Sequence, residues 1–391
     1  MSPKKSKITD ENTPLIFLSV VLVVVLLLST FQLFSVGDIF SEKDAAKEPE
    51  KAKMEIITID SEDCVNCIDL GGFTELIESK NVEITSMEEL AFGSDEAKKI
   101  IEKFSIKQIP TVIMSGEVEE SGVLVDLEGF VEEKNGDYLL TNLPAPYVDT
   151  VTGDIIGLVS VTYILNDDCE ICQDIRPLAQ QLELVGVSVE EHKEIAFDSE
   201  EGKEIIKKYD ITRVPTLVLS AESKYYPDLT EAWEDVGTIE EDGAYVLRNS
   251  LPPYYDLDAK KERGRVNLIS LFDPNCEGCY TTDEFHLPVL ESMGLYLDNQ
   301  EKVSVSTSRG KKLIETYDIN LVPTVILTGE PDAYNAFTQV WDTVGTIEDD
   351  GAYVFRVFDV VNGPYKDLST GEILVPEDPD STEEDASANI S

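Results

Sequence analysis

The chain has 391 residues, of which 42 % are hydrophobic, and its formal net charge is −47. This length fits about two to four domains of ordinary size. The negative charge argues against nucleic-acid binding, because phosphates would be repelled, and against contact of the folded part with anionic lipid. The simplest interpretation is an acidic, well-solvated surface; adaptation to high salt and loose binding of divalent cations are the alternatives.

The amino-terminal segment differs in character from the rest of the chain. Residues 1–13 include Lys4, Lys5 and Lys7, and residues 14–36 carry no charge at all. As a helix rising about 1.5 Å per residue, this run is long enough for the hydrocarbon core of a bilayer. Together with the lysines it predicts a single-pass anchor in the cell membrane, with the rest of the chain outside the cytoplasm. A cleaved signal peptide is the alternative, although the apolar run is long and no Ala-x-Ala follows.

A charged tether is predicted for residues 37–53, and three repeats follow it. Each repeat has a C-x-x-C pair and a later hydrophobic-Pro-Thr sequence, in which the proline comes 46, 46 and 47 residues after the first cysteine. Three pairs at matched distances are a far stronger signal than one. We predict repeats at 54–151, 152–260 and 261–368, and an acidic disordered tail at 369–391. The pairs, which account for all six cysteines, are Cys64 and Cys67, Cys169 and Cys172, and Cys276 and Cys279.

The hydrophobic pattern predicts the same elements in every repeat. A strand leads to the C-x-x-C; a helix, a strand and a second helix come next, and a further strand starts at the hydrophobic-Pro-Thr sequence. In repeat 1 these elements cover residues 55–59, 68–77, 82–84, 94–104 and 111–114. Ser94 and Ser199 are predicted to cap the second helices of repeats 1 and 2.

Each repeat is predicted to close with a hairpin and then a joint. Asn-Gly or Asp-Gly at 135–136, 242–243 and 350–351 favours a type I′ turn between two strands. Trp233, Trp341 and the hairpin tyrosines are expected in the core. Proline-rich residues 144–147, 252–255 and 363–365 are predicted to be short, stiff connections between the repeats.

The C-x-x-C pairs indicate disulfide chemistry. A strand that enters a helix through this motif places the first sulfur at the helix amino terminus, where unpaired N–H groups favour the thiolate. Acidic neighbours such as Asp168 and Glu170 oppose that effect. One alternative is that the disulfides are static clamps. A metal shared between pairs is a weaker alternative, because the pairs lie far apart in sequence.

The element order, the C-x-x-C and the hydrophobic-Pro-Thr sequence resemble the thioredoxin superfamily over roughly residues 54–368. The likeness is closest at 209–216 and 317–324, and Pro177 stands where the family kinks its first helix. It implies an α/β fold of three tandem thioredoxin-like domains with a central sheet flanked by helices and carboxyl-terminal hairpin additions, in an arrangement like protein disulfide isomerase.

The resemblance also implies roles for individual residues. The attacking cysteines would be Cys64, Cys169 and Cys276, with Cys67, Cys172 and Cys279 as the resolving ones. The peptide bonds before three prolines would be cis. An extended substrate would bind the backbone there, at Ile109 and Pro110, Val214 and Pro215, and Val322 and Pro323.

The sequence departs from the family pattern in several places. Asp63, Asp168 and Asn275 replace the tryptophan before the motif, and Thr58, Tyr163 and Ser270 replace a buried aspartate. No histidine lies between the cysteines, and extra strand is expected in place of the family's last helix. His192 and His286 are expected to be ordinary surface or helix residues, and the acidic turns lack the calcium-loop pattern.

From these observations we expect a membrane-anchored, extracytoplasmic thiol–disulfide oxidoreductase. Its partners would be the thiols or disulfides of exported proteins and, through its first helix, the membrane, with no nucleic acid, organic cofactor or metal. The alternative is a non-catalytic binding or scaffold protein whose disulfides only brace the domains.

Overall fold

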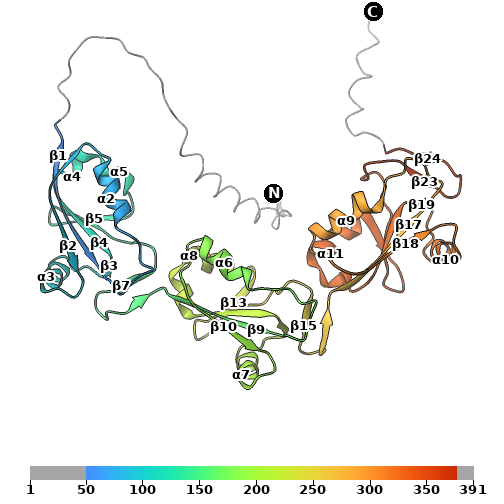
Figure 1. The fold of residues 1–391 in the computed structure, drawn as a ribbon, viewed down its shortest axis with the longest axis horizontal. Coiled ribbons are helices and arrows are strands. Elements are labelled where there is room, and N and C mark those ends of the chain that lie inside the picture. The colour runs from blue at the N-terminus through green and yellow to red at the C-terminus, as the bar shows by residue number, and fades with distance from the viewer. Residues whose placement is uncertain (1–49, 377–391) are drawn as a thin grey trace, which may run out of the picture. The chain divides into compact units, whose positions relative to one another are not determined.

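The computed structural model describes residues 50–376, so the span 14–36 predicted as a membrane anchor lies outside it. Within the described residues, no helix combines the length and apolar character needed to cross a bilayer. The described part is mixed α/β, with three five-stranded sheets flanked by helices (Figure 1). Each sheet belongs to one of the three repeats.

Repeat 1 sets the pattern, with its five-stranded sheet in the order β2-β1-β4-β6-β5. Strand β1 is parallel to β2 and antiparallel to β4. The elements are β1 (Ala52–Asp60), α2 (Gly71–Glu78), β2 (Val82–Ala91), α3 (Asp95–Phe104), β3 (Gln108–Ile109), β4 (Thr111–Gly116), α4 (Val118–Ser121), α5 (Val123–Asp126), β5 (Val131–Lys134), β6 (Asp137–Leu140), β7 (Tyr147–Asp149) and β8 (Ile155–Ile156).

Repeats 2 and 3 have the same strand order, β10-β9-β12-β14-β13 and β18-β17-β20-β22-β21. Repeat 2 contains β9 (Val159–Leu165), α6 (Pro177–Leu184), β10 (Val189–Ala196), α7 (Glu200–Tyr209), β11 (Arg213–Val214), β12 (Thr216–Leu219), η2 (Ala221–Tyr225), α8 (Pro227–Trp233), β13 (Gly237–Ile239), β14 (Tyr245–Leu247), β15 (Tyr254–Asp256) and β16 (Lys261–Arg263). Repeat 3 contains β17 (Arg265–Phe272), α9 (Thr282–Ser292), β18 (Tyr296–Ser304), α10 (Ser308–Tyr317), β19 (Leu321–Val322), β20 (Thr324–Gly329), η3 (Pro331–Ala333), α11 (Asn335–Val344), β21 (Gly345–Ile347), β22 (Tyr353–Phe355), β23 (Tyr365–Asp367) and β24 (Ile373–Leu374).

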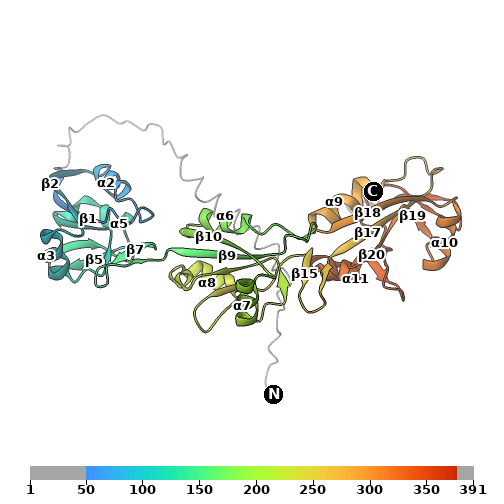
Figure 2. The ribbon, with the colours of Figure 1, turned by 60° about the horizontal axis from the view of Figure 1, so that its bottom comes forward.

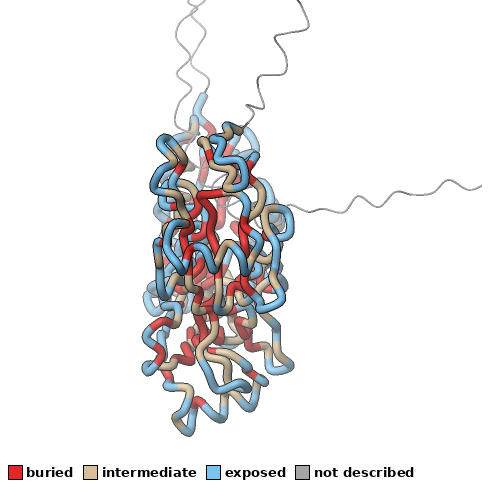
Figure 3. The backbone as a smooth tube through the Cα atoms, turned by 90° about the vertical axis from the view of Figure 1, so that its right-hand side faces the viewer, coloured by how far each residue is buried: buried red, intermediate tan, exposed pale blue. Residues whose placement is uncertain are grey.

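Each sheet has helices packed on both faces, so successive side chains of a central strand, which point to opposite sides, are buried against different helices. In repeat 2, Tyr163 packs with α6 and α8 on one face, whereas its neighbour Ile164 packs with α7 on the other. Figure 1 shows α6 and α8 on one side of this sheet and α7 on the other, and Figure 2 again shows α6 and α7 on opposite sides. Leu217 and Val218 of β12 divide in the same way. Buried residues, red in Figure 3, are therefore concentrated on the central strands and the helix faces that cover them. Full burial of one of their large apolar side chains stabilises the fold by about 1.5–3 kcal/mol.

The predicted helix caps are confirmed. Ser94 Oγ accepts a hydrogen bond from Ala97 N at 3.1 Å, and Ser199 Oγ accepts one from Gly202 N at 2.9 Å. The hairpins are confirmed as well, although only the turn of repeat 1 has positive φ at both Asn135 and Gly136. In the other two repeats only the glycine of the Asp-Gly pair has positive φ, so the type I′ prediction is wrong there.

The expectation that extra strand replaces a last helix is wrong. Helix α8 follows β12 and α11 follows β20, and the two tryptophans lie in these helices rather than in the hairpin strands. Trp233 and Trp341 are nevertheless buried, as predicted. The sequence signal was present, because Pro227 occupies the first turn of α8, where its missing N–H costs nothing.

The predicted joints lead into strands of the repeats themselves, because Tyr147, Tyr254 and Tyr365 begin β7, β15 and β23. In each repeat, a second sheet of three strands forms after the main sheet: β3-β7-β8, β11-β15-β16 and β19-β23-β24. We call its middle strands β7, β15 and β23 the closing strands. The predicted boundary at 151/152 falls inside the β7–β8 hairpin, the boundary at 260/261 falls just before β16, and the predicted tail from 369 includes β24. Apolar Ile373 and Leu374 pair with β23 there, so that part of the tail is ordered structure.

Candidate functional site

All six cysteines form disulfides within their own C-x-x-C pairs. The Cα atoms of the paired cysteines lie 5.3, 5.4 and 5.6 Å apart in repeats 1, 2 and 3. These separations lie near the usual value for a disulfide, so each pair closes without displacing its backbone.

The disulfides lie in turns rather than at helix amino termini, and the predicted position at a helix start is wrong. Cys64 N donates to Ser61 O and Cys67 N donates to Cys64 O, so two reverse turns follow each other. Helix α2 begins only at Gly71. In repeat 2, α6 begins at Pro177, which therefore starts this helix rather than kinking it. The helix dipole falls off within the first turn, so it gives little support to a thiolate at these sulfurs.

The accessible cysteine of each pair differs from the predicted one in two repeats. Cys64 and Cys169 are only 7 % and 8 % exposed, whereas Cys67 and Cys172 are half-buried. In repeat 3, Cys276 and Cys279 are both half-buried. An incoming reagent therefore meets the second cysteine more readily in repeats 1 and 2.

The predicted cis bonds are confirmed before Pro110, Pro215 and Pro323. The strands that end at these bonds were predicted to bind an extended substrate. Each of them pairs with the closing strand of its own repeat, with Ile109 opposite Val148 in repeat 1. Repeats 2 and 3 place Val214 opposite Tyr255 and Val322 opposite Lys366.

Repeat 3 surrounds its disulfide with a buried polar group that the sequence analysis did not identify. Tyr280, directly after Cys279, donates its hydroxyl to Pro323 O at 2.5 Å and lies 3.0 Å from His286 Nε2. Both Tyr280 and His286 are buried, and burial raises the pKa of Tyr280 and lowers that of His286 to about 4. The imidazole is therefore neutral at neutral pH, and Tyr280 links the C-x-x-C turn to the cis-proline strand.

An ion pair joins the same turn to the closing strand of repeat 3. Lys366 Nζ of β23 lies 2.6 Å from Asp273 Oδ2, and their side chains are 19 % and 7 % exposed. Burial opposes ionisation of Asp273, but hydrogen bonds from Lys366 and from Asn275 N outweigh it and lower the pKa. The pair spans 93 residues of sequence, and no local pattern reveals it.

Repeat 2 joins the corresponding parts with uncharged groups. Gln173 N, directly after Cys172, donates to Pro253 O at 3.0 Å, and Ser250 Oγ donates to Pro215 O at 2.6 Å. Repeat 3 has an equivalent of the first bond, from Tyr280 N to Pro364 O at 2.9 Å. In both repeats the segment leading into the closing strand is thus bonded to the residue that follows the disulfide.

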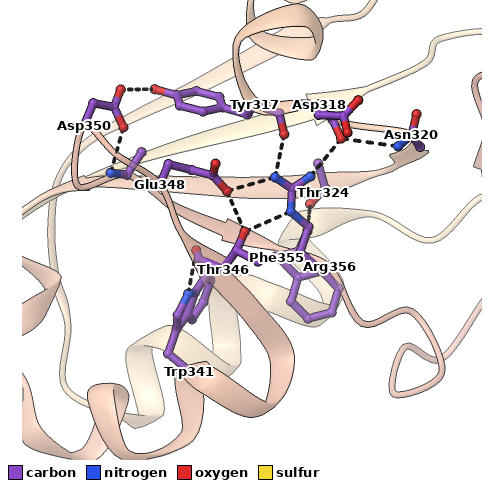
Figure 4. Close-up of polar contacts among 11 residues, drawn as sticks. Tyr317, Asp318, Asn320, Thr324, Trp341, Thr346, Glu348, Asp350, Phe355 and Arg356 are labelled. Carbon is purple, nitrogen blue, oxygen red and sulfur yellow. Dashed lines mark hydrogen bonds and ion pairs between the residues drawn. The ribbon is translucent and has the colours of Figure 1, made fainter.

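An arginine clasp fastens the hairpin to the end of the preceding helix in repeats 2 and 3, and Figure 4 shows that of repeat 3. Arg356 donates to Thr346 Oγ1, Asp318 O, Tyr317 O and Glu348 Oε1. Arg248 makes the corresponding bonds to Thr238 Oγ1, Asp210 O and Glu240 Oε1 in repeat 2. Repeat 1 has Thr141 at this position, so the clasp distinguishes it from the other two.

Other polar residues limit the chemistry available to the sulfurs. Thr58, Tyr163 and Ser270 are buried at the positions where the family resemblance would place an aspartate. They supply hydroxyl groups but no carboxylate base. Between residues 50 and 376, no cluster of three or more histidine, cysteine, aspartate or glutamate side chains has the arrangement of a metal site.

No family model matches the sequence, and no curated protein matches it significantly. Among solved structures, it is similar to the amino-terminal N/C domain of alkylhydroperoxide reductase AhpF from Enterococcus faecalis, at 16 % identity and a TM-score of 0.15 over 43 % of this chain and 82 % of that one. Human ERp44 form II is similar at 10 % identity and a TM-score of 0.14 over 74 % and 83 %. ERdj5 form II is similar at 13 % identity and a TM-score of 0.13 over 71 % of this chain and 37 % of that one. Likenesses of this strength carry no functional conclusion.

Proposed function

We propose that this chain is a thiol–disulfide oxidoreductase built from three tandem thioredoxin-like domains. The observation that carries the proposal is the threefold recurrence of one arrangement: a C-x-x-C disulfide in a turn after β1, β9 or β17, and a later cis-proline strand that pairs with the closing strand. A disulfide between cysteines three residues apart closes only a short loop, and the stabilisation expected from a cross-link grows with the length of the closed loop. A reversible redox role is the simplest reason to have three such bonds.

The proposed reaction is exchange through a mixed disulfide. A thiolate attacks one sulfur of the pair, and the other cysteine leaves as a thiolate and takes up a proton. The predicted attacking role of Cys64, Cys169 and Cys276 and the resolving role of their partners apply to the reduced protein. The weak helix-dipole support makes these thiolates less available than those at a helix amino terminus, so exchange is expected to be slow.

The proposal keeps the predicted location outside the cytoplasm, with residues 14–36 as the membrane anchor. It is supported by the uncharged run, the lysines before it and the presence of all six cysteines in C-x-x-C pairs suited to disulfides, which persist in extracytoplasmic compartments. Protease added to intact cells should digest the repeats. Protection of the repeats until the cells are lysed would contradict this location.

A scaffold with static disulfides is the second candidate, favoured by the burial of Cys64 and Cys169. A redox titration of the full-length protein distinguishes the oxidoreductase from the scaffold. The protein is equilibrated in buffers of graded potential and alkylated, and each pair is assigned by peptide mass. We expect at least one pair to titrate reversibly as a two-electron couple, with about 30 mV per tenfold change in the ratio. Pairs that stay oxidised at every potential that leaves the protein folded would establish the scaffold.

A further inference from the structure

The backbone edge beside each disulfide is filled by the chain itself. Thr150 N donates to Lys107 O at 3.0 Å, just before β3. In an antiparallel pair, the N–H and C=O groups of every second residue point to the same side. The backbone of Ile109, two residues after Lys107, therefore faces β7 and not solvent.

The same geometry recurs in the other two repeats. Leu257 N donates to Thr212 O at 2.9 Å, and Leu368 N donates to Asn320 O at 2.8 Å. Val214 and Val322 again lie two residues further on, each turned toward its closing strand. None of the three positions predicted to bind an extended substrate leaves its backbone groups free to do so.

The closing strands also contact the disulfide loops. In repeat 1, Cys64, Ile109 and Val148 belong to one buried cluster. In repeat 2, Pro253 O, next to the start of β15, accepts from the residue after Cys172. In repeat 3, Lys366 of β23 is paired with Asp273, three residues before Cys276. A polypeptide that added a strand here would first have to displace the closing strand.

Displacement is opposed by a turn that all three hairpins share. The last residue of each closing strand is an aspartate whose Oδ1 accepts two backbone N–H groups of the following turn. Asp149 accepts from Val151 N at 2.8 Å and from Thr152 N at 2.9 Å. Asp256 and Asp367 form the same turn in repeats 2 and 3. These turns thus hold each closing strand in a hairpin with β8, β16 or β24.

Small molecules can reach the sulfurs without moving this strand. Cys67, Cys172 and Cys279 are half-buried, and the residues between the cysteines are mostly exposed, Val65 to 88 %. In disulfide exchange, the attacking sulfur has only to approach one sulfur of the pair in line with the S–S bond. Strand addition instead needs a row of free backbone N–H and C=O groups.

We infer that the C-x-x-C pairs exchange with low-molecular-weight monothiols and their disulfides, and not with extended polypeptides. This inference rests on the oxidoreductase function proposed above and narrows its substrate class. One thiolate attacks the second cysteine, forming a mixed disulfide and releasing the first cysteine as a thiolate that takes up a proton. A second thiolate attacks the small-molecule sulfur of that mixed disulfide. The products are one external disulfide and a reduced pair, so two electrons pass from two monothiols to the protein.

The charge around the pairs adds a preference among such thiols. Asp63, Asp168, Glu170 and Glu277 lie beside or between the cysteines and are exposed. A cationic thiol is attracted to these sites and an anionic one is repelled, most strongly at low ionic strength. Intrinsic nucleophilicity also differs among these thiols, so each rate is divided by the rate of the same thiol with an uncharged model disulfide. The normalised rates are ordered cysteamine, mercaptoethanol, mercaptoacetate, and the differences shrink as salt is added.

The test compares small and polymeric thiols on the oxidised full-length protein. The small thiols are the three above, and the polymeric one is an unstructured polypeptide with a single cysteine. Reduction of each pair is followed by alkylation and peptide mass, and rates are expressed per thiolate. Two variants loosen repeat 3: Leu368→Pro removes the N–H that pairs with Asn320 O, and Lys366→Ala removes the partner of Asp273. Lys302→Ala is the matched control, because it removes the exposed Lys302–Asp283 ion pair of the same repeat.

We expect the small thiols to reduce the wild-type pairs faster than the polypeptide does. Either loosening variant should raise the polypeptide rate at Cys276–Cys279 about five- to thirtyfold. This is the increase in the population of molecules with a displaced closing strand that the loss of one or two hydrogen bonds would cause. The small-thiol rate, measured at high ionic strength where such charge effects are screened, and the control variant should be unchanged. Lys366→Ala retains the backbone pairing, so it keeps the test informative if Leu368→Pro does not fold.

Two failures are distinct. Equal rates for the polypeptide and small thiols on the wild-type protein, or no gain in polypeptide rate in a folded loosening variant, would overturn the substrate class and leave the oxidoreductase intact. No reduction of any pair by any thiol would overturn the proposed function itself, and the inference with it.

Discussion

Repeats 2 and 3 share a scaffold but hold their disulfides differently. Both have the arginine clasp, the same strand order and a closing strand bonded near the residue after the second cysteine. Repeat 3 adds two buried interactions: Tyr280 with His286 and Pro323, and Lys366 with Asp273. Repeat 2 uses the uncharged groups of Gln173 and Ser250 instead. The difference shows that the same backbone framework can hold its C-x-x-C loop either with titratable side chains, whose contribution to stability depends on pH, or with uncharged groups.

The largest expected difference between the two repeats is in their response to acid. Burial lowers the pKa of His286 from 6.5 to about 4, so between these values the unfolded chain binds more protons than the folded one. Stability of repeat 3 therefore falls as the pH falls through this window, by about 3 kcal/mol when the window is crossed. Repeat 2 has no buried histidine and should lack this loss.

The two tryptophans allow each repeat to be followed in the full-length protein. Trp233 lies in repeat 2 and Trp341 in repeat 3, and the chain has no others. Denaturant unfolding of the Trp233→Phe variant at several pH values reports repeat 3, and that of Trp341→Phe reports repeat 2. Adding His286→Gln to the first background should abolish the steep pH dependence. Equal pH dependence of both repeats would contradict the account of His286.

The second difference is the ion pair of the closing strand. Lys366→Ala leaves the nearly buried Asp273 without its lysine, and a hydrogen bond to a charged group contributes about 1.5–3 kcal/mol. Because the pKa of Asp273 is lowered in the folded state, this stabilisation is present above the usual aspartate pKa and is lost as the pH falls below it. Unfolding at neutral pH, followed through Trp341, should show the loss in repeat 3. A variant as stable as Lys302→Ala would mean that the pair contributes nothing.

The smallest expected difference concerns the clasp, which the two repeats share. Arg248→Ala and Arg356→Ala each remove several hydrogen bonds from a partly buried guanidinium and should each cost about 1–2 kcal/mol in their own repeat. Similar losses in both repeats would confirm that the clasp belongs to the common scaffold. A loss of stability confined to repeat 3 would instead mean that the clasp acts together with the buried contacts particular to that repeat.

Much of the scaffold followed from the sequence because its signals are local. Ser94 and Ser199 predicted the helix caps, short apolar runs predicted the strands, and the family resemblance of the hydrophobic-Pro-Thr sequences implied the cis bonds. Helix α8 was missed because its seven residues carry too few periodic positions to outweigh the strand-like run that follows.

The candidate site was only half predictable, since its defining contacts join residues far apart in the chain. The cysteines and their pairing were evident from spacing, but no local pattern reveals that Lys366 reaches Asp273 or that Tyr280 reaches Pro323. The proline-rich segments suggested linkers, and only the register of β3 with β7 shows that they lead into strands filling the supposed substrate edge. A C-x-x-C sequence fits both a turn and a helix start, so its spacing alone does not show which of the two surrounds the disulfide.

Amide hydrogen exchange at the closing strands tests the central claim most directly. If the edge beside each disulfide is filled in solution, the N–H groups of Thr150, Leu257 and Leu368 should be protected, because each donates to the strand before the cis-proline. Exchange at least about a hundredfold slower than in an unstructured peptide would correspond to roughly 3 kcal/mol of local stability. Exchange at the unstructured rate for all three amides, in a protein whose central strands remain protected, would show that the edges are open and contradict the account.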